Sequence, residues 1–380
     1  MNNFKIPFNK PRITGNELQY IEEAVNNGHI SGDGIFTKKC QEFMENRYHT
    51  KKILLTTSCT SALEMAAILC NFSPGDEVIM PAFTFVSTAN AFILNGAKIK
   101  FVDIREDTLN IDENLLEKAI TKNTKAIVVV HYAGVSCEMD KIMQITKKYN
   151  LFVIEDAAQA IESEYKDKCT GTIGDFGCFS FHETKNITCG EGGAILINND
   201  QFIERAEIIR EKGTNRSKFF RGEIDKYTWV DTGSSYLPSE ILSAFLYAQL
   251  ENIEDITAKR LKIWQIYYES LEDLEKKGYI RRPIIPSECK HNGHLFYILL
   301  ESLDVRSRLI YYLKNKGILS VFHCVPLHLS PMGVRLGLSS GDMNITENVS
   351  DTLLRLPLYY DISQDEQNLI INEIYNFFMK

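Results

Sequence analysis

The most informative segment of the chain is Cys178-Phe179-Ser180-Phe181-His182-Glu183-Thr184-Lys185-Asn186, which is soon followed by Gly190-Glu191-Gly192-Gly193. The pattern predicts a strand that ends near Ser180, a turn that carries Lys185 and a glycine-rich corner. Glycines at such a corner allow positive φ angles or a close approach of the backbone to a ligand. A lysine among apolar neighbours can lose its proton and act as a Schiff-base nucleophile. An isolated lysine in a turn is usually only solvated, so the surrounding sequence has to decide between the two interpretations.

Around this segment, from about residue 50 to 200, short β-branched runs alternate with amphipathic stretches of helical length. Strands that are apolar throughout and separated by such stretches predict a mainly parallel sheet covered on both faces, an α/β architecture. The strands expected are Ile53–Thr56, Glu77–Met80, Lys98–Asp103, Ala126–His131, Leu151–Glu155, Phe176–Phe181 and Ala194–Ile197, and the helices between them include Ser61–Asn71, Asp112–Ile120 and Met139–Tyr149.

The remainder of the chain divides into an arm and a second domain. Apolar residues at helical spacing predict one long connecting helix over Ile241–Ile266. Beyond it we expect a strand at His294–Leu300, a helix at Val305–Lys316, a strand at Ile318–Phe322 and a helical C-terminus. The domains predicted are therefore an N-terminal arm (1–35), a large α/β domain (36–250) and a small α+β domain (251–380).

Composition excludes several classes of protein. The chain has 380 residues, of which 44% are hydrophobic, and a net charge of −8, which argues against a nucleic-acid binder. No apolar stretch is long enough to span a membrane and Met1–Lys5 begins no apolar signal core, so we expect a soluble, cytoplasmic protein. Nine scattered cysteines without a Cys-x-x-Cys pair predict reduced, mostly buried thiols and no metal site.

Ligands of open parallel sheets lie at the carboxyl ends of the strands. The first strand ends in Thr56-Thr57-Ser58-Cys59-Thr60 and opens a helix, which is either an anion site or an ordinary helix cap. The second ends near Phe85, an aromatic that can stack on a planar cofactor or pack in the core. Asp156 follows a buried strand, with Gln159 three residues later. A carboxylate there is costly unless it faces a cation such as a protonated ring nitrogen, or caps a helix.

The order of these features, a Ser/Thr cluster, an aromatic, a strand-end Asp with Gln, and then Ser and Lys, is the order expected of a fold-type I enzyme that uses pyridoxal 5′-phosphate (PLP). The chain resembles the sugar aminotransferases of the DegT/DnrJ/EryC1/StrS family from Ile6 to the C-terminal helix. The stretches that carry the resemblance are Ser31-Gly32-Asp33-Gly34, Val130-His131-Tyr132-Ala133-Gly134, Phe181–Asn186, Gly213-Thr214-Asn215-Arg216 and Asp225-Lys226-Tyr227-Thr228-Trp229.

The resemblance implies a fold-type I aminotransferase whose large domain has a mainly parallel seven-stranded sheet, and a PLP site with defined roles. Lys185 would bond to the cofactor and move the proton, while Asp156 would keep the pyridine nitrogen protonated. Gln159 would lie near the ring hydroxyl and Phe85 on the ring face. The phosphate would be held by Ser58, Cys59, Thr60 and Ser180. Many relatives carry Asn in a Gly-x-Asn-x-Arg stretch that reaches the partner subunit's phosphate, and Ser235 occupies that position here. The resemblance also implies a homodimer with active sites at the subunit interface.

For the substrates, the resemblance implies amino transfer from L-glutamate to a dTDP-linked keto-sugar, dTDP-4-dehydro-6-deoxy-D-glucose, giving dTDP-4-amino-4,6-dideoxy-D-galactose and 2-oxoglutarate. Four cations and no acid lie between Lys212 and Arg221, which indicates either a site for pyrophosphate or donor carboxylate, or a solvated loop. The substrate contacts expected are His182, Arg216, Arg221, Tyr227 and His328.

Two alternatives stay open at this point, and the sequence argues against a third. The same scaffold could give the 4-amino-4,6-dideoxyglucose epimer or a 3-amino-3,6-dideoxyhexose, because regiochemistry depends on how the sugar sits in its pocket. A non-catalytic regulatory or binding protein on the same fold is a different class, although Lys185, Asp156 and Gln159 together argue against it. A nicotinamide-dependent sugar enzyme would need Gly-x-Gly-x-x-Gly after the first strand, and Gly32-Asp33-Gly34 lacks the third glycine.

Overall fold

The computed structural model describes residues 4–323, 325–336 and 341–379. Its centre is a seven-stranded sheet in the order β1-β9-β8-β5-β4-β2-β3, which confirms the predicted α/β fold. β9 is antiparallel to both of its neighbours, and the other adjacent pairs are parallel. The strands are β1 (Lys52–Thr56), β2 (Glu77–Pro81), β3 (Lys98–Val102), β4 (Thr124–Val130), β5 (Phe152–Asp156), β8 (Phe176–Ser180) and β9 (Gly193–Ile197).

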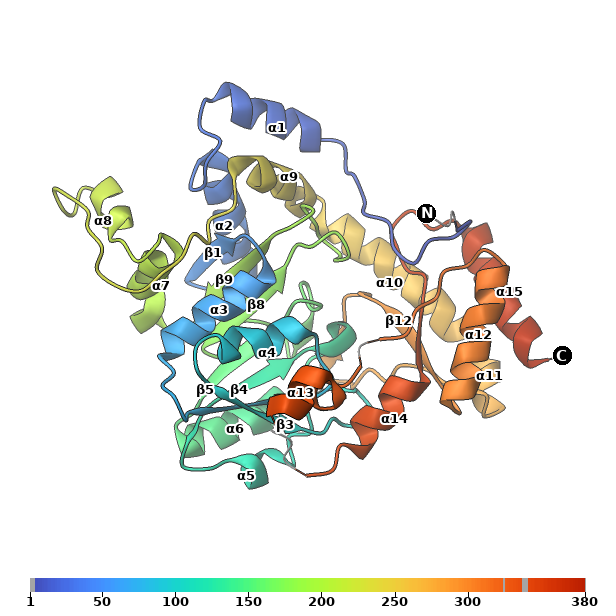
Figure 1. The fold of residues 1–380 in the computed structure, drawn as a ribbon. Coiled ribbons are helices and arrows are strands. Elements are labelled where there is room, and N and C mark those ends of the chain that lie inside the picture. The colour runs from blue at the N-terminus through green and yellow to red at the C-terminus, as the bar shows by residue number, and fades with distance from the viewer. Residues whose placement is uncertain (1–3, 324, 337–340, 380) are drawn as a thin grey trace.

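Helices cover both faces of this sheet because its strands are apolar on both sides (Figure 1). Successive strand residues point to opposite faces. Ile154 accordingly packs in the cluster beneath α3, α4 and α7, whereas Val153 packs beside α6. The predicted helix at Asp112–Ile120 is limited to the single turn of α5 (Leu116–Ala119). The other helices named are α3 (Cys59–Cys70), α4 (Val86–Ile93), α6 (Met139–Tyr149) and α7 (Ile203–Arg210).

The prediction of one long connecting helix is wrong. Two helices, α9 (Glu240–Glu251) and α10 (Ile253–Ser270), meet at Asn252, whose φ of −109° departs from helical geometry. The Asn252 side chain donates a hydrogen bond to the carbonyl of Ala248 at 2.9 Å. This local contact occupies a carbonyl in the last turn of α9 and favours the end of the helix there. The helical spacing of apolar residues continues across Asn252, but the helical backbone is interrupted.

The C-terminal part builds its own antiparallel sheet in the order β10-β12-β13, with β10 (Ile280–Arg281), β12 (Phe296–Leu300) and β13 (Leu353–Leu356). The strand predicted at Ile318–Phe322 is wrong, because that segment makes only isolated bridges from Ile318 to Ile6 and from Val321 to Arg355. The helices packed here include α12 (Leu303–Asn315), α14 (Asn344–Thr352) and α15 (Gln364–Phe378). Boundaries at 35/36 and 250/251 stay predictions.

The N-terminal segment crosses the molecule. Ile6 is buried against the C-terminal sheet, and α1 (Glu17–Asn26) lies beside α9, as Figure 1 shows. Eight described cysteines are free thiols, and all except Cys169 are buried, as predicted. Cys324 lies outside the described residues. In the part of the chain that the structure describes, no helix has the length and apolar character needed to cross a membrane.

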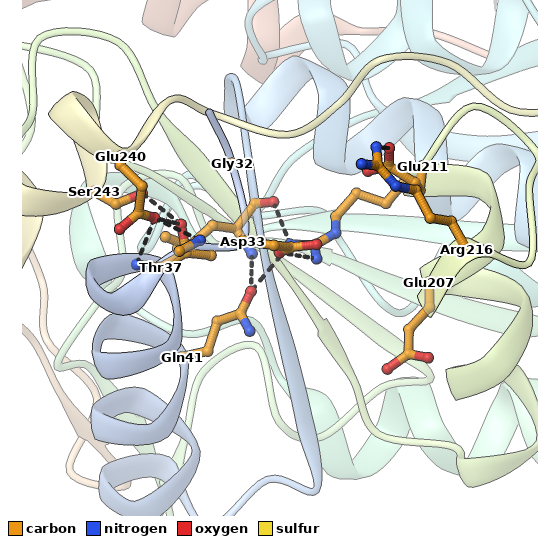
Figure 2. A network of polar contacts seen from close by, with 12 residues as sticks. Gly32, Asp33, Thr37, Gln41, Glu207, Glu211, Arg216, Glu240 and Ser243 are labelled. Atoms are coloured by element: carbon orange, nitrogen blue, oxygen red, sulfur yellow. Dashed lines mark hydrogen bonds and ion pairs between the residues drawn. The ribbon is translucent and has the colours of Figure 1, made fainter. Parts of the chain in front are cut away.

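The Ser31-Gly32-Asp33-Gly34 stretch leads into α2 (Ile35–Tyr48), whose N-terminus meets the buried carboxylate of Glu240 (Figure 2). Glu240 accepts from the amides of Gly34, Phe36 and Thr37 at 3.1, 2.7 and 3.0 Å and from the Thr37 hydroxyl. A Cβ at Gly34 would come 2.5 Å from Cδ of Glu240, so glycine is required here for packing. One carboxylate therefore satisfies the free amides of α2 and ties it to α9.

This contact predicts that Glu240→Ala lowers the free energy of unfolding by about 3 kcal/mol, because it leaves several buried amides without an acceptor. Urea titration measures the difference. The matched control is Glu254→Ala, which removes a side chain that is 80% exposed and pairs with Arg47, so it should cost at most about 1 kcal/mol. Equal losses in the two variants would contradict this account of the α2 terminus.

Candidate active site

A cavity of about 720 Å³ opens at the carboxyl ends of the central strands. One wall comes from the large sheet, at the ends of β1, β5 and β8 and the starts of α3 and α4. The opposite wall comes from the C-terminal part of the chain, through Phe322, His323 and Arg355, together with Phe8 of the N-terminal segment. The position is the one expected for a ligand of an open parallel sheet.

Asp156, the last residue of β5, faces this cavity and is only 6% exposed. The Thr88 hydroxyl donates to Oδ2 at 2.7 Å, and the amide of Ala158 donates to Oδ1 at 3.2 Å. Burial raises the pKa of Asp156, while these two hydrogen bonds and the nearby charge of Lys185 act to lower it. The carboxylate is thus fixed in a poorly solvated place where a cationic ring nitrogen would compensate its charge.

The residue before it, Glu155, points to the opposite face and is fully buried. Its carboxylate accepts from Nε2 of His131 at 2.9 Å and from the amides of Gly171, Ile173 and Gly174 at 2.7, 2.7 and 2.6 Å. Nδ1 of His131 accepts from the amide of Cys137, which leaves Nε2 as the nitrogen that donates to Glu155. Sequence reasoning missed this pair, although His131 stands in one of the stretches that carried the family resemblance.

Lys185 lies on a tight turn after β8 and lines the cavity. Two hydrogen bonds close the turn. The amide of Lys185 donates to the carbonyl of His182, and the amide of Glu183 donates to the carbonyl of Gly190. Nζ of Lys185 has no hydrogen-bond or ionic partner among the described residues. Burial lowers the pKa of Lys185, and so does the charge of Arg355, although Cys59 and Asp156 oppose the shift. The site therefore favours a neutral amine, the form that attacks an aldehyde or accepts a proton.

The N-terminus of α3 lies on the same wall. Ser58 caps the helix by accepting from the amide of Ser61 at 3.1 Å, while Cys59 and Thr60 belong to the first turn, whose amides have no partner within the helix. A Cβ at Gly193 would come 2.4 Å from the amide nitrogen of Cys59, so only glycine lets β9 pass here. Ser180 completes this edge. Helix amides and hydroxyls are the groups that hold a phosphate.

Gln159 and Phe85 also line the cavity. Oε1 of Gln159 accepts from the amide of Ala133 at 2.8 Å, which leaves its Nε2 as a donor for a ligand. Phe85 is 65% exposed, whereas the nearby Phe83 is buried in the core. The core interpretation of Phe85 is therefore wrong, and its ring is accessible from the cavity.

Of the predicted substrate contacts, only His182 lines this cavity. Arg216 pairs with Glu211 at 3.2 Å, and Arg221 pairs with Glu207 and Glu223 at 2.8 and 2.6 Å. Tyr227 and Ser235 are exposed on the same excursion between α7 and α9, which projects from the body with α8 (Arg216–Phe220), as Figure 1 shows. His328 contacts Glu347 instead, at 3.0 Å. Residues that sequence reasoning did not select, Thr88, His294, His323 and Arg355, line the cavity.

A cavity-facing lysine with a lowered pKa, a buried aspartate and a helix N-terminus at the carboxyl edge of this sheet define a PLP-dependent aminotransferase of fold type I, and the residues present fit that cofactor. The chain belongs to the DegT/DnrJ/EryC1/StrS aminotransferase family, whose model matches residues 11–375. It is a sugar aminotransferase, and its cofactor is PLP.

Among its relatives, the spore coat polysaccharide biosynthesis protein SpsC of Bacillus subtilis is 32% identical over 98% of this chain and 97% of its own. GDP-perosamine synthase of Caulobacter vibrioides is also 32% identical, over 95% of each chain. The PLP form of the putative sugar aminotransferase Spr1654 from Streptococcus pneumoniae superposes with a TM-score of 0.90, at 27% identity over 98% of both chains.

The Thr88 contact predicts a pH-dependent effect on cofactor affinity. Because the hydroxyl lowers the pKa of Asp156, Thr88→Val should raise it further, so Asp156 becomes neutral at a higher pH and no longer pairs with a cationic ring. The dissociation constant for PLP should rise about tenfold, more at acidic than at alkaline pH. Fluorescence titration of the cofactor-free protein measures it. Thr88→Ser keeps the donor and should bind nearly as the original, whereas equal losses in both variants would contradict the assignment.

Proposed function

We propose that this enzyme transfers the amino group of L-glutamate to C4 of dTDP-4-dehydro-6-deoxy-D-glucose, giving dTDP-4-amino-4,6-dideoxy-D-galactose and 2-oxoglutarate. The observation that carries the proposal is that Lys185 and Asp156, which are 29 positions apart in the sequence, line one cavity. The stretches Phe181–Asn186 and Asp225–Trp229, on which the family resemblance rests, support the sugar-nucleotide substrate.

A second nucleotide has support as well. Two relatives are named GDP-perosamine synthases, one from Caulobacter vibrioides and one from Escherichia coli O157:H7, which favours GDP as the alternative to dTDP. SpsC is named a spore coat polysaccharide biosynthesis protein. We therefore assign the amino sugar made by this enzyme to the synthesis of a surface polysaccharide.

Each residue of the cavity has a task in this reaction. When bound, PLP supplies an electron sink for the carbon that exchanges the amino group. The Lys185 amine, whose pKa burial lowers, would bond to the cofactor and then move the proton to and from the reacting carbon. Asp156 would pair with the ring nitrogen and keep it protonated. Gln159 would lie near the ring hydroxyl, and Phe85 would cover the ring face. Ser58, Cys59, Thr60 and Ser180 would hold the phosphate, and His182 lines the same cavity.

The working unit in this proposal is a homodimer. The excursion between α7 and α9 exposes the apolar side chains of Phe220, Trp229 and Val230, with Trp229 78% exposed. An apolar group of this size on a projecting segment is typical of a protein interface. We assign its partner as a second copy of this chain, whose active site would then receive Arg216, Arg221, Tyr227 and Ser235.

Lys185→Ala should lower turnover by more than about 10³-fold, since it removes both the cofactor bond and the general base. The test incubates the enzyme with L-glutamate and dTDP-4-dehydro-6-deoxy-D-glucose and follows 2-oxoglutarate. Lys147→Ala, at an exposed position on α6, is the matched control and should be fully active. NMR of the product locates the new C–N bond. Full activity of Lys185→Ala, amination at C3, or turnover of the GDP-sugar alone would each overturn its part of the proposal.

The dimer assignment predicts that Phe220→Asp combined with Trp229→Asp converts the protein to a monomer, because two charges would be buried at the interface. Light scattering after gel filtration gives the mass. Tyr311→Asp, which alters a 68% exposed aromatic on α12, should leave the dimer intact. A protein that is monomeric before any substitution would remove the second copy from the scheme.

A further inference from the structure

The residue after Lys185 joins the lysine turn to a distant segment of the chain. Asn186 is 5% exposed, and both ends of its side-chain amide are engaged. Nδ2 donates to the carbonyl of Asn292 at 3.0 Å, and Oδ1 lies 3.0 Å from Nδ1 of His294. Asn292 and His294 precede β12, the central strand of the C-terminal sheet. One buried side chain therefore attaches the lysine turn to the C-terminal part of the chain.

These contacts fix the position of the proton on His294. A carbonyl can only accept, so the Asn186 amide presents Nδ2 to Asn292 and Oδ1 to His294. Nδ1 of His294 is therefore the donor, and Nε2 of the neutral ring carries no proton. Burial lowers the pKa of His294 well below its usual value, and the charge of Lys185 acts in the same direction. The ring stays neutral at working pH, so the bond to Asn186 keeps this polarity.

The segment that holds Asn186 is itself fixed to the large sheet. Asn292 is fully buried, and its Nδ2 donates to the carbonyls of Gln159 and Ile161 at 2.9 and 2.7 Å. Its Oδ1 accepts from the amide of His294 at 2.9 Å. A Cβ at Gly134 would come 2.0 Å from this oxygen, so only glycine leaves room for it. Asn292 thus sets its segment against the residues that follow β4 and β5.

A buried cation holds the same segment from the side of α10. Arg260 is 3% exposed and has no carboxylate partner in the part of the chain that the structure describes. Nε donates to the carbonyl of Gly293 at 3.2 Å, and Nη2 donates to those of His294 and Leu358 at 2.6 and 3.3 Å. Burial lowers the pKa of Arg260 to about 9. Because a buried cation without hydrogen bonds is costly, these carbonyls and Arg260 fix one another.

The amine of Lys185 has no such anchor. Among the described residues its Nζ has no hydrogen-bond or ionic partner, so its direction depends on the backbone of the turn. The hydrogen bonds that close the turn join it only to itself. Asn9 of the N-terminal segment donates to the carbonyl of Glu183 at 3.2 Å, but this contact is exposed. The buried link beside the lysine is the one through Asn186.

We propose that Asn186 is a positioning residue for Lys185, which attaches the lysine turn to residues 292–294 and so keeps the Lys185 amine in the cavity. The inference rests on the proposed function, because it takes Lys185 as the residue that bonds to PLP. It assigns no chemical step to Asn186 or His294. Loss of the link should let the turn move toward solvent.

The pKa of Lys185 separates a positioning role from a purely structural one. Burial is the main cause that lowers this pKa, so a turn that moves toward water should raise it toward the usual value of lysine. The other titratable groups that interact with Lys185 all remain in place when Asn186 is replaced, and they are Cys59, Asp156, His294, His323 and Arg355.

The test compares Asn186→Ala with Asn198→Ala in the full-length protein after removal of PLP. The amide of Asn198 also donates to two carbonyls, those of Gly171 and Gly174 at 2.9 Å each, but lies outside the cavity. Acetic anhydride modifies Lys185 at a series of pH values, and mass spectrometry of the peptide gives the midpoint. The midpoint should rise by about one pH unit in Asn186→Ala and stay unchanged in Asn198→Ala.

Two variants of His294 repeat the test from the other side of the bond, and they serve if Asn186→Ala does not fold. His294→Asn places an amide donor where Nδ1 lies and should keep the original midpoint, whereas His294→Leu removes the donor and should raise it. An unchanged midpoint in both Asn186→Ala and His294→Leu, or an equal rise in Asn198→Ala, would overturn the inference. Borohydride reduction of the PLP-loaded original protein tests the proposed function separately, which fails if the label is found on a lysine other than Lys185.

Discussion

Two adjacent carboxylates at the end of β5 impose the constraint around which the site is built. Residues in sequence on a strand point to opposite faces, so placing Asp156 in the cavity forces Glu155 into the packed layer behind the sheet. An unpaired carboxylate buried there would cost several kcal/mol, roughly the stability of a small domain. His131 and three amides of the segment 171–174 donate hydrogen bonds to the Glu155 carboxylate and offset this cost.

These contacts of Glu155 hold together parts of the chain that form the site. His131 follows β4 and is locked by the amide of Cys137, so β4 and β5 are fixed relative to each other at their carboxyl ends. The segment 171–174 leads directly into β8, the strand that ends at Ser180 just before the lysine turn. On the cavity side, Thr88 of α4 holds Asp156. The contacts of Glu155 and Asp156 therefore connect β4, the segment that leads into β8 and the lysine turn, and the helix that follows Phe85.

The elements that could be predicted from the sequence are those marked by a pattern within their own few residues. All seven strands of the large sheet were predicted, because each is an apolar run bounded by polar residues, and Lys185, Asp156 and Gln159 follow such strands. The small sheet was predicted poorly. Leu353–Leu356 is a short run attached directly to α14, whereas Ile318–Phe322 has better strand composition but finds only isolated partners. Which of the two pairs with β12 depends on contacts between distant segments, and a local pattern does not contain them.

The same distinction explains why one wall of the cavity was predicted and the other was missed. The wall of the large sheet is made of strand ends and helix starts, features that follow from propensity and capping. The facing wall joins Phe8, His323 and Arg355, which come from the N-terminal segment, a loop and the small sheet. His323 stands in a His-x-x-Pro-Leu-His stretch typical of the family, from which His328 and not His323 was selected, and Arg355 within Leu353-Leu354-Arg355-Leu356 is simply one cation in an apolar run. Its place in the cavity wall depends on the bridge to Val321 and on the contact with Phe8, and both join segments that lie far apart in the sequence.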